Sequence, residues 1–222
     1  MKKLILSLLV VGSFAANGSE AVAPNVEWSA KSLRQALDSR PFGDPLRGET
    51  LNTQHMCASC HGKDGIAPTP NWPSVAGQLE SYTFKMLLDY QSGARAEDNR
   101  ANVMTAVVDM LSPQDMSDLA SYYASLEAPS LAAGKSIPKL VTKGDPKRLI
   151  TPCASCHGLT GQGGIKGTPA IAGQSADVLK RALEFYQSGE RHSDLYSVMR
   201  QAAMRLTADE IDSLSDYYSS QD

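Results

Sequence analysis

The feature that most constrains this chain is a five-residue stretch that occurs twice. Residues 57–61 read Cys-Ala-Ser-Cys-His, and residues 153–157, 96 positions later, repeat them letter for letter. Two cysteines three positions apart lie on one side of a helical turn, so both thiols can reach one edge of a flat ring. C-x-x-C-H is the attachment signature of a c-type haem, in which both cysteines bond to the porphyrin and the histidine is offered to the iron. The chain is therefore predicted to carry two covalent haems. The predicted attachment points and proximal ligands are Cys57, Cys60 and His61, and Cys153, Cys156 and His157.

Three other uses of four cysteines are less consistent with this pattern. Disulfides in an exported protein would not explain why a histidine follows each pair. A four-cysteine zinc site usually has its pairs about 15–20 residues apart, far closer than here. A thioredoxin-like redox pair belongs in a βαβ unit, and no such unit is visible in the sequence.

The N-terminus has the order of a secretory signal peptide. Lys2 and Lys3 precede an apolar run, and small residues follow it, with cleavage expected near residue 15 or as late as residue 23. The apolar run is too short to span a bilayer, which disfavours an uncleaved anchor. We therefore expect a soluble or membrane-peripheral protein in the bacterial periplasm, where c-type haem is attached.

An internal repeat divides the rest of the chain. From Cys57 to Arg95, 17 of 39 residues are identical at an offset of 96, and later matches continue at an offset of 95 after one residue is lost. The expected organisation is an N-terminal extension over residues 16–44, a first domain over 45–127, a linker over 128–138 and a second domain over 139–222. In the extension, residues 26–37 are predicted to form a short helix that covers the first domain.

Within each domain the sequence predicts short helices and no strands. A first helix should open near Gly48 or Gly144 and carry the cysteines toward its end, and a glycine-rich loop should follow. The next helix is expected over 81–91 or 177–187. The last should start at Ser112, a good cap followed by a proline, or at Thr207, which has Glu210 three residues on.

The repeat also selects the second axial ligand of each haem. Of the eight methionines, a single aligned pair is methionine in both copies, Met104 and Met199. Methionine and histidine are a known axial pair for haem iron. The alternative is that both methionines only fill the core. His55 and His192 are not repeated and are expected to be surface or packing residues.

These residues resemble the class I cytochrome c domain used twice, as in the di-haem cytochrome c4 family. The resemblance rests on the doubled CASCHG, the Pro-x-x-Ala-Gly-Gln loop, the Tyr-x-x-Gly-x-Arg helix end and the late methionine, and covers about residues 45–222. It implies an all-α fold of two facing domains, each wrapped around one haem. It also implies a periplasmic carrier between a dehydrogenase or quinol-oxidising complex and a terminal oxidase or other acceptor.

In a domain of this type, further repeated residues are candidates to support the haem. The carbonyls of Pro73 and Pro169 could accept the second N–H of the ligating histidine, although each proline could simply make a turn. Arg95 and Arg191 could pair with the haem propionates, and Tyr90 and Tyr186 could hydrogen-bond to them. The alternative for these four residues is a shared contact between helices.

Two classes of function follow from the ligands. With histidine and methionine on both irons no coordination site is open, which favours electron transfer over catalysis. The alternative is a di-haem subunit or dedicated acceptor of a sulfide- or thiosulfate-oxidising dehydrogenase, or a di-haem enzyme. The catalytic thiosulfate enzymes use an additional cysteine ligand, and this chain has no fifth cysteine. The expected partners are redox proteins.

The charge of the chain is uneven between the two copies. Residues 41–127 contain five Lys and Arg against eleven Asp and Glu, whereas residues 136–222 contain ten of each. Such a difference can steer different partners to the two domains, or it can serve solubility alone. The balance gives no indication of nucleic-acid binding. The sequence leaves the oligomeric state open.

Overall fold

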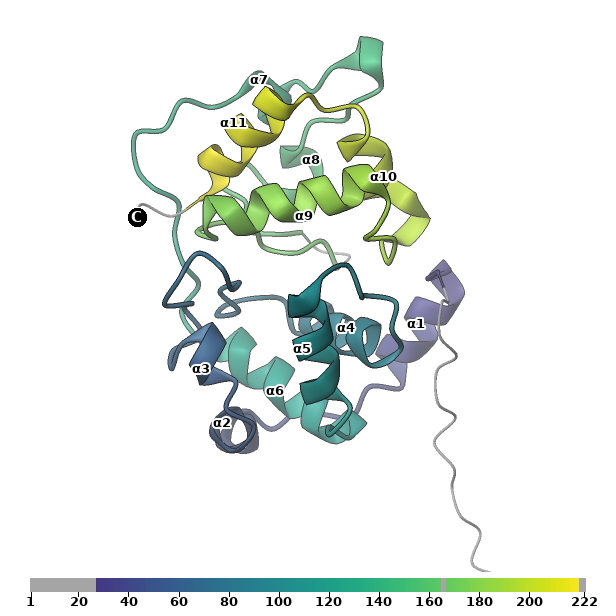
Figure 1. The fold of residues 1–222 in the computed structure, drawn as a ribbon, viewed down its shortest axis with the longest axis vertical. Coiled ribbons are helices and arrows are strands. Elements are labelled where there is room, and N and C mark those ends of the chain that lie inside the picture. Colours follow the sequence, from purple (N-terminus) through teal and green to yellow (C-terminus); the bar gives the residue numbers. More distant parts are fainter. Residues whose placement is uncertain (1–26, 165–166, 220–222) are drawn as a thin grey trace, which may run out of the picture.

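The computed structural model describes residues 27–164 and 167–219, and it builds them almost entirely from helices (Figure 1). The first-domain helices are stacked below those of the second domain, and α1 (Ala30–Asp38) lies at the side of the stack. Within the described ranges the β-structure is limited to two isolated bridges, Asp145 to Ile150 and Gln174 to Ser219. The expected signal peptide lies outside the described residues. No helix in the described part has the length and apolar character to cross a membrane.

The first domain is formed by five helices, and their starts follow from local capping. They are α2 (Pro45–Gln54), α3 (Ala58–His61), α4 (Glu80–Gln91), α5 (Asn99–Val108) and α6 (Pro113–Ser125). The Ser112 hydroxyl accepts from the Asp115 amide, and Pro113 occupies the first turn where no amide is needed. Asp98 caps α5 in the same way, through the amides of residues 100 and 101.

The second domain repeats this plan with shorter pieces. It contains α7 (Lys139–Thr142), the 3₁₀ turn η1 (Pro146–Arg148), α8 (Ala154–His157), α9 (Ala176–Ser188), the 3₁₀ turn η2 (Leu195–Ser197), α10 (Val198–Ala203) and α11 (Ala208–Tyr218). Thr207 caps α11 in a reciprocal box with Glu210, as the sequence predicted. The helices predicted over 81–91 and 177–187 are α4 and α9, each within one residue at either end.

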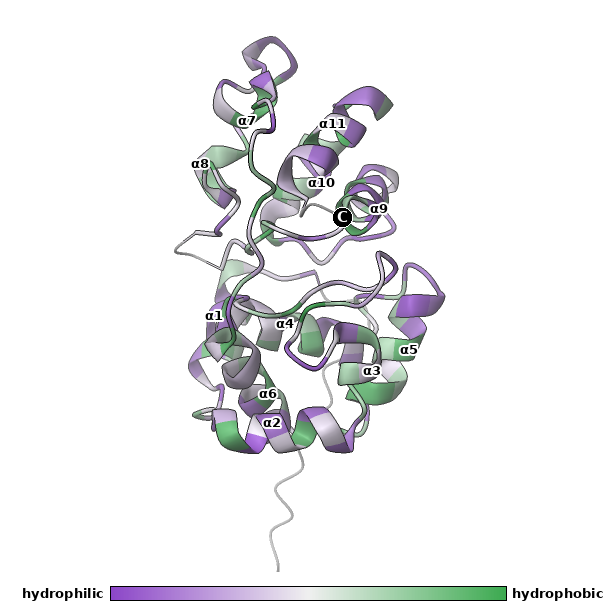
Figure 2. Cartoon of the chain, turned by 90° about the vertical axis from the view of Figure 1, so that its left-hand side faces the viewer, coloured by the Kyte–Doolittle hydropathy of each residue, from purple (hydrophilic) through white to green (hydrophobic). Residues whose placement is uncertain are grey.

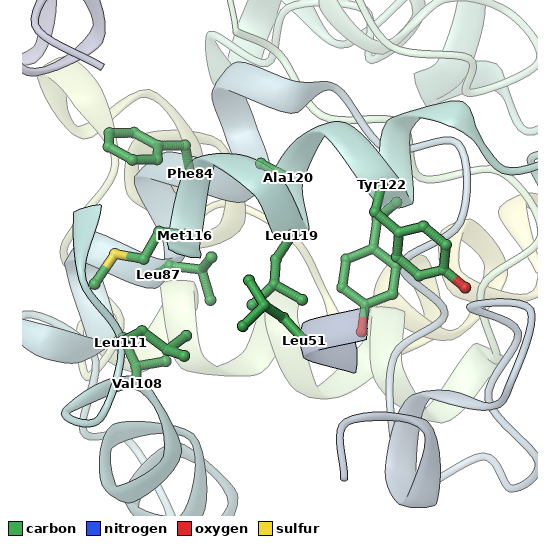
Figure 3. Packing of buried hydrophobic residues seen from close by; sticks show 10 residues of the cluster. Leu51, Phe84, Leu87, Val108, Leu111, Met116, Leu119, Ala120 and Tyr122 are labelled. Atoms are coloured by element: carbon green, nitrogen blue, oxygen red, sulfur yellow. The ribbon is translucent and has the colours of Figure 1, made fainter. Parts of the chain in front are cut away.

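Each domain has its own apolar core. In the first, side chains from α2, α4 and α6 interdigitate, and Figure 3 shows Leu51, Leu87 and Leu119 meeting at its centre. Met116 is fully buried there. A second cluster joins Val141, Ile211 and Leu214 with their neighbours. Figure 2 shows hydrophilic and hydrophobic residues interspersed along α2. Each half of the described chain thus has a small core of its own.

The prediction of one continuous helix leading into each cysteine pair was wrong. In the first domain α2 ends at Gln54, and Met56 takes a left-handed conformation, φ 53°, before α3 begins. Gly48 lies inside α2 as expected. Glycine is needed at this position because α2 crosses α6 so closely that a Cβ would meet the Asp118 carbonyl. In the second domain Gly144 is not helical, with φ 60°, and a turn closed by the Asp145–Ile150 bridge replaces the helix. Pro146 and Pro152 explain the difference, since proline disfavours a helix interior.

The N-terminal helix also differs from its prediction. It spans Ala30–Asp38 rather than residues 26–37, because Ser29 caps it through the Ser32 amide. Trp28 therefore precedes the helix. The helix contacts both domains rather than the first alone, as described below.

Candidate haem sites and the surface between them

The two C-x-x-C-H stretches fold identically. Cys57 and Cys153 each precede a one-turn helix with φ −58° and ψ −36°, and each histidine amide donates to the preceding first-cysteine carbonyl at 3.0 Å. In this structure the four cysteines are not paired with one another. In the described part of the chain, no group of three or more His, Cys, Asp and Glu side chains could hold a metal ion. The geometry fits covalent attachment of a ring on one side of each turn.

The two histidines are held by matching hydrogen bonds. His61 Nδ1 lies 2.8 Å from the Pro73 carbonyl oxygen, and His157 Nδ1 lies 3.0 Å from that of Pro169. A carbonyl can only accept, so Nδ1 carries the proton and Nε2 keeps its lone pair. Burial lowers the pKa of both imidazoles, despite the opposing effect of the carbonyl, and therefore keeps them neutral near pH 7. A neutral ring with a free Nε2 is the form that can ligate iron.

Met199 lines the same cavity as the second cysteine pair. A cavity of about 380 Å³ is bounded by Cys153, Cys156, His157 and Met199, with Leu179, Leu183 and Ile171 among its apolar walls. A histidine and a thioether on one apolar cavity, with two thiols at its edge, are the groups that would hold a c-type haem and supply both axial ligands.

In the first domain, burial separates the methionines. Met104 is partly buried and packs, together with Cys57, against the core cluster. Met56 and Met110 are exposed, and Met116 is sealed in the core. Met86 lies between the domains, where its sulfur accepts from an arginine. Met104 is thus the methionine whose surroundings suit a ligand.

The helices that carry the two methionines are built differently. Met104 lies in the middle of α5, whereas Met199 lies in the first turn of α10. The second copy is one residue shorter here, and Tyr196 and Ser197 take left-handed conformations with φ 56° and 55°. These two strained residues compensate for the missing residue, and Met199 lines the cavity.

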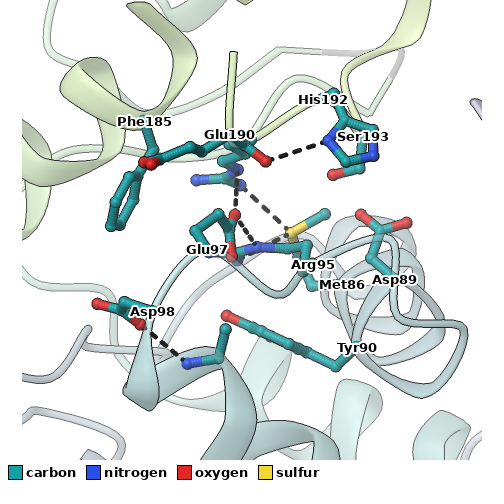
Figure 4. A network of polar contacts seen from close by, with 12 residues as sticks. Met86, Asp89, Tyr90, Arg95, Glu97, Asp98, Phe185, Glu190, His192 and Ser193 are labelled. Atoms are coloured by element: carbon teal, nitrogen blue, oxygen red, sulfur yellow. Dashed lines mark hydrogen bonds and ion pairs between the residues drawn. The ribbon is translucent and has the colours of Figure 1, made fainter. Parts of the chain in front are cut away.

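The predicted arginines and tyrosines form two matching stacks. Figure 4 shows Arg95 and Tyr90 of the first stack, with Glu97 beside Arg95. The Arg95 guanidinium lies 4.5 Å from the centre of the Tyr90 ring, and that of Arg191 lies 4.6 Å from the centre of the Tyr186 ring. Both arginines approach Glu97, Arg95 Nε at 2.9 Å and Arg191 Nε at 3.9 Å from Oε1. The stacks therefore meet at the surface between the domains.

Two buried atoms in this cluster have no hydrogen-bond partner, Arg191 Nε and Glu97 Oε2. Arg191 also lines the second haem cavity. A buried guanidinium with an unused N–H beside the cavity fits an anionic propionate. Arg95 Nε already donates to Glu97, so Arg95 has fewer N–H groups left for a propionate. Burial raises the pKa of Tyr90 and Tyr186, which leaves both hydroxyls as potential donors.

Sequence reasoning missed the role of the residues that join the two sites. Gln78 Nε2 donates to the Ala170 carbonyl at 2.8 Å, and its Oε1 accepts from the Ala170 amide at 2.9 Å. Gln174 makes the same pair of bonds with Ser74, at 2.6 Å and 3.0 Å. The two glutamines are equivalent in the repeat, so the contact has approximate two-fold symmetry. Their presence in both Ala-Gly-Gln stretches was the available signal.

Comparison with known proteins agrees with this geometry. The cytochrome c family profile matches residues 46–127 and again 145–222. Cytochrome c4 of Thiocapsa roseopersicina is 35% identical over 185 residues, which is 79% of this chain and 91% of that protein. A thiosulfate dehydrogenase electron acceptor of Stutzerimonas stutzeri is 32% identical and covers 73% of this chain and 77% of its own length.

Solved structures give the same picture. Reduced recombinant cytochrome c4 from Pseudomonas stutzeri superposes with a TM-score of 0.71 at 32% identity, over 79% of this chain and 97% of that chain. The thiosulfate dehydrogenase TsdBA of Marichromatium purpuratum gives 0.69 at 27% identity, over 79% of this chain but 40% of that one.

The fold and sites define a c-type cytochrome with two haem domains, and the chain belongs to the cytochrome c family. Within that family it groups with the di-haem cytochromes c4, as the sequence motifs predicted. The predictions of an all-α fold of two cytochrome c domains and of two haem c groups are confirmed. The chain is a di-haem electron-transfer cytochrome.

Proposed function

We propose that this cytochrome is a periplasmic carrier. It would take electrons from a dehydrogenase or quinol-oxidising complex and pass them to a terminal oxidase or another acceptor. In this proposal His61 with Met104 and His157 with Met199 are the axial ligands, and the four cysteines attach the haems. The domains follow the predicted boundaries, 45–127 and 139–222, and the protein is exported after removal of its N-terminal signal.

One observation carries the proposal. Each proximal histidine is fixed by the proline carbonyl of a loop whose next residue is held by a glutamine of the other domain. The two sites are thus rigidly joined through short polar contacts. When bound, haem supplies a one-electron couple at each site, and paired axial ligands leave no position for a substrate. A rigid pair of closed sites suits transfer rather than turnover.

A second candidate is supported by two relatives described as thiosulfate dehydrogenase electron acceptors. In that case the donor would be a separate dehydrogenase that oxidises thiosulfate, and this chain would serve as its acceptor. The chemistry within the chain would be the same, and the partner would differ.

Partner kinetics test the carrier proposal. The purified di-haem protein should be reduced rapidly by a catalytic amount of thiosulfate dehydrogenase with thiosulfate, or by a quinol-oxidising complex, and reoxidised by an oxidase. Alone, it should show no steady turnover of thiosulfate or peroxide. Sustained thiosulfate oxidation by the isolated chain would contradict the carrier role, and absence of exchange with all of these partners would do the same.

The charge difference between the domains suggests separate docking sites, but the acids must be chosen from the structure. Glu97 and Asp118 are buried, and Asp98 caps α5. Replacing any of them by a basic residue would therefore damage the fold. Exposed acids of the first domain are better targets, namely Glu49, Asp64, Asp109 and Glu127. Reversing these four should slow one partner's association and weaken its salt dependence, while the other partner's rate stays unchanged. Equal effects on both partners would contradict separate docking.

A further inference from the structure

Residues 27–40, here called the N-terminal strap, lie before residue 46, where the family profile begins. We propose that the strap is part of the second haem site, that it closes this site from the side of the first domain, and that it thereby raises the reduction potential of the second haem relative to the first. The inference deepens the proposed function, because it gives the two haems an order, and it rests on the assignment of Met104 and Met199.

The strap is anchored on the first domain at its C-terminal end. Arg40 Nη1 donates to Glu80 Oε1 at 2.5 Å and to the hydroxyl of the fully buried Ser117 at 3.0 Å. The same guanidinium lies 6.0 Å from the centre of the Phe84 ring. These contacts fix the exit of α1 against α4 and α6.

The middle of the strap faces the second haem cavity. Leu33 and Leu37, four residues apart on one face of α1, line that cavity along with His157 and Met199. Leu37 also packs against the core of the first domain. The two leucines, both partly buried, therefore place apolar side chains between the domains at the cavity edge.

The beginning of the strap is tied to both domains. Trp28 Nε1 donates to Asp89 Oδ1 at 2.6 Å, and Lys85 Nζ donates to Asp89 Oδ2 at 2.6 Å. Lys85 also donates to the Ser193 carbonyl of the second domain at 2.8 Å and lies 5.5 Å from the centre of the Trp28 ring. Glu27 pairs with Arg200 at 2.8 Å. The strap thus crosses the surface between the domains.

The network also places a buried ion pair, Lys85 with Asp89, beside the second site. Lys85 and Asp89 are buried, and Lys85 lines the cavity. The repeat counterpart of Lys85 is Arg181, whose Nη2 donates to the Asn71 carbonyl on the loop of the first haem site. Each site thus receives a cation from the opposite domain, whereas the strap contacts the second site.

The segment that precedes the second domain takes another course. Pro129 and Leu131, in residues 128–138, line a different cavity beside Gly77 and Thr160. Lys135 Nζ donates to the Ser219 hydroxyl at 2.8 Å. The repeat therefore does not provide the first haem site with the same cover, and the two sites have different surroundings.

The direction of the effect follows from charge. Oxidised haem carries one more positive charge than reduced haem, and an apolar, water-excluding cover disfavours the charged form. Closing the second site should therefore favour its reduced state, which makes the second domain the end where electrons collect.

The experiment compares single substitutions in the full-length di-haem protein. Leu33→Asn places an amide in the cover, and Trp28→Phe keeps a ring but removes the N–H that binds Asp89. Leu46→Asn makes the same chemical change at an exposed leucine of α2 and serves as the matched control. Both haem potentials are measured by spectroelectrochemical titration. Each variant is also made together with Met104→His, which shifts the potential of the first haem, so that the remaining potential can be assigned to the second haem.

We expect Leu33→Asn and Trp28→Phe to lower the second potential and leave the first unchanged. For Leu33→Asn the equilibrium distribution of one electron between the haems should shift by about tenfold, or about 59 mV. Leu46→Asn should move neither potential. Hydrogen exchange should show protected amides in residues 30–38 of the unaltered protein, with faster exchange in Trp28→Phe.

Several outcomes would overturn the inference. Unchanged potentials with lowered thermal stability would show that the strap only links the two domains. A change in the potential of the first haem would show that the strap acts on the first site and not on the second. Unprotected amides in the strap, or an intact mass that begins after residue 40, would remove it from the functional protein. A Met104→His change that moves both potentials or neither would instead contradict the ligand assignment, which is a failure of the proposed function.

Discussion

Gln174 holds the peptide groups of Ser74 on both sides, accepting from its amide at 3.0 Å and donating to its carbonyl at 2.6 Å. The residue before Ser74 is Pro73, whose carbonyl oxygen lies 2.8 Å from His61 Nδ1. A side chain of the second domain thus steadies the loop that orients the proximal histidine of the first. Gln78 does the same for the loop of His157 through Ala170.

This crossed arrangement predicts crossed effects. Gln174→Ala should change the potential and the His61 ring N–H resonance of the first haem, while the second haem stays as it was. Gln78→Ala should do the reverse and is its matched control. Each change leaves a backbone amide and a carbonyl without partners and should lower the free energy of unfolding by about 1–3 kcal/mol. Redox titration and NMR distinguish the two haems. An effect of either substitution on the haem of its own domain would contradict the crossed arrangement.

The methionine assignment predicts two separate shifts. Met104→His and Met199→His should each lower the potential of one haem, because imidazole favours ferric iron more than a thioether does. Met110→His and Met204→His, at two exposed positions, are the controls and should leave both potentials unchanged. Titrations in which an exposed position has the larger effect would show that the repeat had been aligned wrongly.

Covalent attachment predicts a stoichiometry. The purified protein should contain two haems per chain that remain bound in acidic organic solvent. Replacing Cys153 and Cys156 by serine should leave one covalent haem, retained by the first domain. A pyridine haemochrome assay and intact mass measure both values, and a single haem in the unaltered protein would disprove the doubled site.

The crossing of α2 and α6 predicts a stability effect. Gly48→Ala places a methyl group against the Asp118 carbonyl and the Tyr122 side chain, and should destabilise the first domain by about 1–3 kcal/mol. Thr50→Ala on the exposed face of the same helix is the control, with a change within about 0.5 kcal/mol. Denaturant unfolding followed by far-UV circular dichroism measures both. An unaltered midpoint for Gly48→Ala would mean that the helices can separate at no cost.

Much of the fold was predictable because its signals are local. The repeat, the Ser112 and Thr207 caps and the helical spacing of α4 and α9 each depend on residues close together in the chain. The breaks before the cysteines were not predictable from the repeat, because the two copies reach the same turn by different routes. Met56 and Gly144 take left-handed conformations that depend on what packs around them.

The candidate ligands were predictable for the same reason, since the C-x-x-C-H spacing is itself a geometry. The contacts between domains were not. Arg95 and Arg191 approach one buried carboxylate, Glu97, whose repeat counterpart Ser193 has no carboxyl group. The roles of Trp28 and Lys85 likewise depend on a segment that the repeat does not include. Long-range pairing between copies leaves no periodic trace in a single sequence.

The matched glutamines have a consequence for how such a protein arises and changes. A contact in which each half offers the same groups to the other is the kind that closes a symmetric dimer of two separate, identical domains. Joining the halves through residues 128–138 replaces encounter between molecules with an effective local concentration on the order of millimolar. The four glutamine bonds then act together with the other polar contacts between the domains, such as those of Lys85 and Arg181. Once the halves share one chain, each is free to vary alone, and Tyr196, Ser197 and the strap are places where the two halves differ.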